Sequence, residues 1–138
     1  GNSLAIIFRI ANENNSKSII NYIENNKNNK LVYNVIPSLP SKFIYKPMYL
    51  LNLQDYHNNL YWLWVNNIYN SAIKIYDYSS NLIIDKITFQ YQFFYETLTS
   101  KLNPTRHYFQ SSEINFSESA GSYLFSKKDK KFIKDFFF

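Results

Sequence analysis

The chain has 138 residues, a net charge of +5 at pH 7 and an aromatic content of 20%. This length suits one domain that buries a core without disulfides or metals. Because the chain contains no cysteine, disulfides, thiolate zinc sites and a cysteine nucleophile are excluded. No apolar run reaches the length of about 18 residues that a membrane-spanning helix needs, and no signal peptide is visible.

The sequence is interpreted as a short remnant followed by one domain. Gly1-Asn2-Ser3 resembles a cloning remnant, and residues 4–138 are expected to form a single domain excised from a longer protein. The abundance of Asn, Ile, Tyr, Phe and Lys is typical of an AT-rich genome, which explains the basic, aromatic composition more simply than nucleic-acid binding does. Only Arg9 and Arg106 supply guanidinium groups, the better partners for phosphate, which favours the same explanation.

The first part of the chain predicts a strand, a helix and a second strand. Residues Leu4–Ile10 and Lys30–Ile36 are rich in β-branched and apolar side chains, which favours strands. Between them, Asn12–Asn26 carries isoleucines at helical spacing, with Asn15 or Ser16 near the N-terminal cap. The apolar face of this helix is expected at Ile19, Ile20 and Ile23.

Prolines interrupt the next stretch. Pro37 and Pro40 end the second strand, and the apolar residues Phe43–Leu53 contain Pro47. Because proline cannot donate a hydrogen bond to a sheet, we expect an edge strand here, or a strand that begins after Pro47. Residues 54–59 are expected to form a loop.

The best-specified architecture lies between Leu60 and Leu102. Residues 60–65 and 72–77 are predicted strands, joined by the polar segment 66–71, which has the length of a hairpin loop. The apolar period then changes to about 3.6 residues, which predicts one helix that ends before Asn103-Pro104. Its apolar stripe is expected at Ile84, Ile87, Tyr91, Phe94, Leu98 and Leu102.

The last part of the chain leaves two interpretations open. Residues 106–110 suit a short strand and residues 111–119 a loop. Residues 120–138 suit either one helix, which we favour, or a hairpin of 122–126 against 131–136 around a charged turn. Together the elements predict an α+β fold, with a mixed or antiparallel sheet flanked by helices.

Several motifs in this architecture resemble the adenovirus endopeptidase (adenain), which belongs to the wider group of Ulp1-type cysteine proteases. The most specific piece is Tyr91-Gln92-Phe93-Phe94-Tyr95-Glu96-Thr97-Leu98, which is similar to that family's helix motif at the same distance after the hairpin. Tyr61-Trp62 stands where the family has His-Trp, and Ser119-Ala120-Gly121 resembles its nucleophile element. The similarity extends over Leu50–Phe125, about half of the chain, and implies the adenain/Ulp1-type fold.

The resemblance also implies which positions correspond to the catalytic residues. In that family a histidine activates a cysteine, an acid orients the histidine, and a glutamine helps to hold the oxyanion. The corresponding positions here are Tyr61 for the histidine, Asp77 for the acid, Ala120 for the nucleophile, and the neighbourhood of Glu113 for the glutamine. A phenol, whose pKa is about 10, is a poor base at neutral pH, and alanine has no nucleophile. No intact catalytic residue is therefore expected.

The function that follows is a catalytically inactive, adenain-like pseudoprotease domain with a binding or structural role in a viral protein or capsid. Its expected partner is a protein or peptide, including other virion proteins, in the host cell interior or the virion. Neither a cofactor, a metal nor a membrane is expected. Two alternatives stay open: an active viral cysteine endopeptidase whose nucleophile was mutated at position 120, and a basic, aromatic nucleic-acid-binding domain.

Trp62 and the lysines of the run 127–131 are the candidate binding residues, and their alternatives are a core position and a solvated face. These lysines are Lys127, Lys128, Lys130 and Lys131. A relocated pair of His57 with Asp55, or a hydroxyl nucleophile at Ser119 or Ser122, is a weaker catalytic candidate.

Overall fold

The computed structural model describes residues 1–28, 31–51, 53–79, 84–91, 95–99, 101–103 and 116–136. Within them the chain is rich in helices and contains one short two-stranded antiparallel sheet, which is an α+β architecture in the general sense. The elements are α1 (Asn2–Ile7), α2 (Glu13–Asn26), the 3-10 helix η1 (Ser41–Phe43), α3 (Pro47–Leu50), β1 (Tyr61–Trp62), α4 (Leu63–Lys74), α5 (Ile84–Tyr91), β2 (Thr97–Leu98), α6 (Ser117–Ser126) and α7 (Lys130–Phe136).

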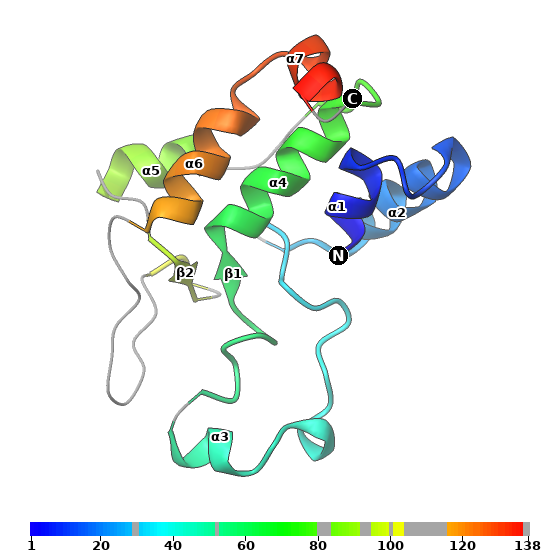
Figure 1. Ribbon diagram of the computed structural model, residues 1–138. Coiled ribbons are helices and arrows are strands. Elements are labelled where there is room, and N and C mark those ends of the chain that lie inside the picture. The colour runs from blue at the N-terminus through cyan, green and yellow to red at the C-terminus, as the bar shows by residue number, and fades with distance from the viewer. Residues whose placement is uncertain are drawn as a thin grey trace.

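Helix α4 is the central element of the body (Figure 1). It packs mainly against α6 on one side and α1 on the other, and α2 lies beyond α1. Strand β1 leads directly into α4 and pairs with β2, with Tyr61 opposite Leu98 and Trp62 opposite Thr97. The segment that carries η1 and α3 extends away from these helices (Figure 1).

The core consists of two apolar clusters, and α4 contributes to both. One cluster is built from α1, α2, α4 and α7; its buried members are Ile6, Ile7, Ile20, Ile23, Val32, Tyr69, Ala72, Ile73, Ile75 and Ile133. The other surrounds the small sheet and α5; its buried members are Leu31, Tyr61, Leu63, Ile84, Ile87 and Leu98. Because α4 supplies Leu63 to one cluster and Ile73 to the other, it connects the two halves of the domain.

The prediction of a strand–turn–strand hairpin over 60–77 is wrong, since α4 occupies Leu63–Lys74 and only Tyr61–Trp62 is a strand. The predicted turn lies inside the helix, and its asparagines Asn66 and Asn67 are buried. Polar residues in a short run usually indicate a loop. Here they are buried because each one finds hydrogen-bond partners on a neighbouring segment.

The two asparagines connect α4 to opposite neighbours. The Asn66 side chain accepts from the Val32 N–H at 2.7 Å and donates to the Val32 carbonyl at 2.9 Å. The Asn67 side chain donates to the carbonyl of Ser119 at 3.1 Å and to the Ser122 hydroxyl at 3.2 Å, both in α6. Consecutive residues of a helix point about 100° apart, so adjacent side chains can reach different neighbours.

The same contacts explain why Lys30–Ile36 is not a strand. Within its described residues, 31–36, Leu31 forms only an isolated bridge with Asn28. In a strand, the backbone N–H and carbonyl of Val32 would bond to a neighbouring strand. Here both groups form hydrogen bonds with the side chain of Asn66. An asparagine side chain carries one acceptor and one donor group, like a peptide, and so replaces a strand partner.

At the N-terminus the prediction is wrong for one element and confirmed for the next. Leu4–Ile10 was expected as a strand but α1 covers Asn2–Ile7, and the adjacent residues Ile6 and Ile7 are both buried in one cluster. Adjacent strand residues would point to opposite faces. The predicted helix at Asn12–Asn26 is confirmed as α2, although its cap is Asn12, whose side chain accepts from the Asn15 N–H.

The later elements differ mainly in their bounds. The helix expected to continue to Leu102 is described as α5 up to Tyr91, and Thr97–Leu98 pairs with β1 instead. Residues 92–94, which include the predicted stripe residue Phe94, lie outside the described residues. Leu102 has a positive φ of 62° and lies in a turn, so its position in a helical stripe is wrong. At the C-terminus the helical interpretation is confirmed over the hairpin, but as two helices, α6 and α7, separated at residues 127–129.

Two further predictions concern the segments around these elements. The edge strand expected within Phe43–Leu53 is wrong, because η1 and α3 occupy this stretch. The strand expected at 106–110 and most of the loop expected at 111–119 lie outside the described residues, and residues 117–119 open α6.

Candidate interaction surface

Tyr61 and Asp77, two of the positions that the resemblance assigns to a catalytic triad, lie far apart. Tyr61 precedes α4 and Asp77 follows it, so they lie at opposite ends of a helix of 12 residues, which is about 18 Å long. Tyr61 is fully buried, and its ring stacks on that of Tyr33 with 4.4 Å between the ring centroids. The carboxylate of Asp77 instead accepts a hydrogen bond from Lys130 of α7.

Ala120 lies on α6, beside the first half of α4. Its neighbour Ser119 is buried; the Ser119 hydroxyl donates to the Tyr95 carbonyl at 2.9 Å, and its own carbonyl accepts from Asn67. The hydroxyl of Ser122 donates to the Ser119 carbonyl at 3.1 Å. Both serine hydroxyls are thus held by backbone groups, as is usual for structural serines in helices. Glu113 lies outside the described residues.

Trp62 is a core residue at the edge of the body. Its side chain is buried, and its Nε1 donates to the Tyr56 carbonyl at 2.7 Å. The His57 ring stacks on Trp62 with 5.1 Å between centroids. The carboxylate of Asp55 accepts from Asn59 at 2.6 Å, and in the described part of the chain no ion pair joins it to His57. The structure therefore gives His57 and Asp55 separate packing roles.

Two lysines of the basic run 127–131 form ion pairs with residues of α5 and of the turn after α4. Lys127 pairs with Asp85 of α5, and Lys130 pairs with Asp77 after α4. Burial lowers the pKa of Lys127, but the hydrogen bond and charge of Asp85 outweigh it and raise this pKa above its ordinary value. Lys128 lies over the Phe132 ring at 5.2 Å from its centroid. Two of the four lysines in this run are therefore paired with carboxylates of the same chain at the surface.

Lys74 has a related role at the end of α6. Its ammonium group donates to the Ser126 carbonyl and lies 3.4 Å from the Lys128 carbonyl. A cation at the C-terminus of a helix is favourable because the last carbonyl groups carry partial negative charge. Burial, and then the nearby Lys127, lower the pKa of Lys74. This lysine therefore serves the packing of α6 on α4.

Two features of the described residues bear on a site for a metal ion or a small ligand. Its described histidine, aspartate and glutamate side chains form no group of three or more that could hold a metal ion. A cavity of about 270 Å³ lies where α1, α2 and α4 meet, but none of its lining side chains is charged. Tyr22, Tyr33 and Trp64 are among those lining residues.

The most unusual surface is the segment 37–51, which we call the arm. None of its residues is buried, although it is rich in large apolar side chains. Phe43 is 66% exposed, Tyr45 74% and Leu50 80%. The exposed large apolar residues of the arm are Leu39, Phe43, Tyr45, Tyr49, Leu50 and Leu51.

The base of the arm is fixed by polar contacts. The Asn58 side chain accepts from the Leu39 N–H at 2.6 Å and donates to the Leu39 carbonyl at 3.0 Å. These two hydrogen bonds join the start of the arm to the segment that follows it. Ser38 donates to Asn59 at 2.6 Å, and the Tyr56 hydroxyl donates to Glu96 at 2.5 Å. The arm therefore has a base that is held by hydrogen bonds and an outer part that is rich in exposed apolar side chains.

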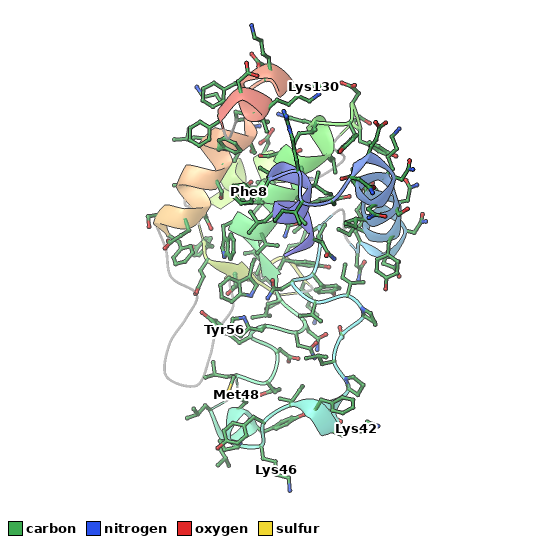
Figure 2. All side chains as sticks on the ribbon, turned by 45° about the vertical axis from the view of Figure 1, so that its right-hand side comes forward. Phe8, Lys42, Lys46, Met48, Tyr56 and Lys130 are labelled. Carbon is green, nitrogen blue, oxygen red and sulfur yellow. The ribbon has the colours of Figure 1, made fainter. Side chains whose placement is uncertain are left out.

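The charge of the arm has one sign. Lys42 and Lys46 are its only charged residues, and both are exposed. Figure 2 places them at the outer end, away from the helices of the body. The ammonium group of Lys42 lies over the Phe43 ring, 5.0 Å from its centroid.

Sequence reasoning missed the arm because an apolar stretch was expected to be buried in a sheet. A usable signal is the clustering of prolines: Pro37, Pro40 and Pro47 lie within this one apolar stretch. Prolines that close together oppose both a helix and a sheet, so such a stretch is a candidate for a projecting loop.

Comparisons of this chain with protein-family models, with curated proteins and with solved structures find no match. In the described residues, no helix is long and apolar enough to cross a membrane.

Proposed function

We propose that this chain is a non-catalytic binding domain and that the arm, residues 37–51, is its binding element. The observation that carries the proposal is that the arm buries none of its side chains while six of its large apolar side chains are exposed. Burying one such side chain is worth about 1.5–3 kcal/mol, which the folded chain alone does not gain here. Contiguous exposed apolar surface usually marks an interaction site.

The base of the arm supports this proposal. Asn58 closes the loop through both backbone groups of Leu39, so the outer part is held in place before any partner arrives. Binding by an element that is already ordered loses less conformational entropy. The arm thus has exposed apolar surface and a prearranged position.

The relationship to the adenovirus endopeptidase group stays a prediction from sequence motifs. The inactive, binding part of that prediction agrees with the proposal, but the site differs. The active-protease alternative requires a usable histidine beside Asp77, and Lys130 pairs with Asp77 instead. The nucleic-acid alternative relied on the lysine run, where Lys127 and Lys130 are engaged in ion pairs.

The proposal predicts that the arm is dispensable for folding. The variant Phe43→Ser/Tyr45→Ser/Leu50→Ser should keep the Tm of the wild type and lose most of the fluorescence gained on binding an apolar dye such as anilinonaphthalene sulfonate. The core variant Ile73→Ala is the matched control and should lose about 2–5 kcal/mol of stability. If the arm variant unfolds as readily as Ile73→Ala, the arm is part of the fold and the proposal is wrong.

A further inference from the structure

We propose that the arm docks on an anionic lipid surface, with its outer part at the boundary between head groups and acyl chains. This inference rests on the proposed function, because it names what the binding element binds. It differs from the expectation that no membrane is a partner. That expectation was based on the lack of a membrane-spanning segment. A peripheral element needs no such segment.

The shape of the arm favours a lipid surface over a protein groove. Exposed apolar side chains are spread along the whole arm: Leu39 lies before η1, Phe43 ends η1, Tyr45 lies between η1 and α3, and Leu50 ends α3. The arm extends from the body as a projection (Figure 1). A projection that is apolar on many sides is surrounded completely by lipid, whereas a groove covers only some of its sides.

The backbone of the arm is suited to a medium with little water. Several of its outer amides are satisfied locally: Ile44 N–H donates to the Ser41 carbonyl at 3.1 Å, Met48 N–H to the Tyr45 carbonyl at 2.9 Å, and Tyr49 N–H to the Lys46 carbonyl at 3.0 Å. Prolines have no N–H group to satisfy. Unpaired amides are costly in hydrocarbon, so this local pairing removes one obstacle to insertion.

The side chains follow the order expected at a membrane boundary. Lys42 and Lys46 can keep their ammonium groups among anionic head groups while their alkyl stems lie along apolar surface. Tyrosines such as Tyr45 and Tyr49 favour the same boundary, where one end of the ring is apolar and the hydroxyl is wet. No acidic residue lies in 37–51 to oppose an anionic surface.

Polar residues at the base set a limit to insertion. Ser38, Asn58 and Asn59 are joined by hydrogen bonds where the arm meets the body. These groups are well solvated by head groups and water but not by acyl chains. Insertion is therefore confined to the outer part of the arm.

The test measures co-sedimentation of the whole chain with vesicles of phosphatidylcholine, with and without phosphatidylserine. We expect binding to the anionic vesicles, and a loss of about tenfold or more in partitioning for Phe43→Ser/Leu50→Ser. The variant Lys42→Glu/Lys46→Glu should lose binding to anionic vesicles. Its control, Lys128→Glu/Lys131→Glu, makes the same change in net charge on the lysine run and should retain more binding.

A second measurement uses the lack of native cysteine. An environment-sensitive fluorophore on Leu50→Cys should shift to the blue with anionic vesicles, and the same label on Lys17→Cys in α2 should not. If the wild type does not bind vesicles, or if both labels behave alike, the lipid inference is overturned. If vesicle binding fails but the triple serine variant of the arm keeps the wild-type Tm and loses the dye fluorescence, the proposed function still holds. The binding partner would then be an apolar groove on a protein.

Discussion

At the scale of single residues, this fold depends on polar side chains that replace backbone partners. Asn66 is the clearest case, because its one amide satisfies both the N–H and the carbonyl of Val32 in the interior. An unpaired buried polar group costs about 1–3 kcal/mol. The position therefore tolerates little substitution.

We predict that Asn66→Ala lowers the free energy of unfolding by about 3 kcal/mol, because two buried backbone groups of Val32 lose their partner. Asn70→Ala is the matched control in the same helix: the buried Oδ1 of Asn70 accepts no hydrogen bond within the described residues. Both changes gain the same helix propensity. Urea denaturation compares them, and equal losses would show that the Asn66 contacts carry no special weight.

Tyr69 gives a prediction about pH. Burial, together with its 2.8 Å hydrogen bond to Glu24, raises the pKa of Tyr69 far above its ordinary value. The folded state then keeps this proton at a pH where the unfolded state loses it. Its contribution to stability is complete below about pH 10 and falls as the pH rises past that value.

The variant Tyr69→Phe isolates this contribution. Above about pH 10 the stability of the wild type should fall more steeply than that of Tyr69→Phe, by about 1.4 kcal/mol per pH unit, since other titrating groups are common to both. Chemical denaturation at several alkaline pH values measures the two slopes. Parallel slopes would mean that Tyr69 ionises equally easily in both states.

At the scale of elements, α2 could be predicted and α4 could not. In α2 the isoleucines follow a helical period and a polar cap precedes them, so local signals agree with the fold. In α4 the buried face includes Asn66, Asn67 and Ser71, which sequence patterns assign to a turn. The partners of Asn66 and Asn67 lie on segments far away in sequence, so tertiary contacts decide the structure.

We expect the arm to open locally without unfolding of the helical body. Asn58→Ala removes both hydrogen bonds to Leu39 and should speed amide hydrogen exchange in residues 39–51. The amides of α4 should keep their protection, because the core does not include the arm. Asn59→Ala, at an exposed position beside it, should have a smaller effect. Faster exchange in α4 as well would contradict this separation.

At the scale of the whole molecule, the helical body and the arm differ in how far they could be predicted from the sequence. The body could be assigned to the α+β class from composition and periodicity, yet most expected strands became helices because apolar residues pack around α4. The candidate site could not be placed, since Tyr61 and Asp77 were expected across a hairpin and lie at opposite ends of α4. The arm's role depends on its exposure, which no local pattern shows directly.

The continuity of α4 is the central structural claim, because this helix separates Tyr61 from Asp77 and contributes to both core clusters. Backbone chemical shifts of residues 60–77 measured by NMR test it most directly. We expect helical Cα shifts without interruption over Leu63–Lys74, including Asn66 and Asn67. Extended shifts at 60–65 and 72–77, with a turn between them, would show a hairpin in place of α4 and contradict the fold described above.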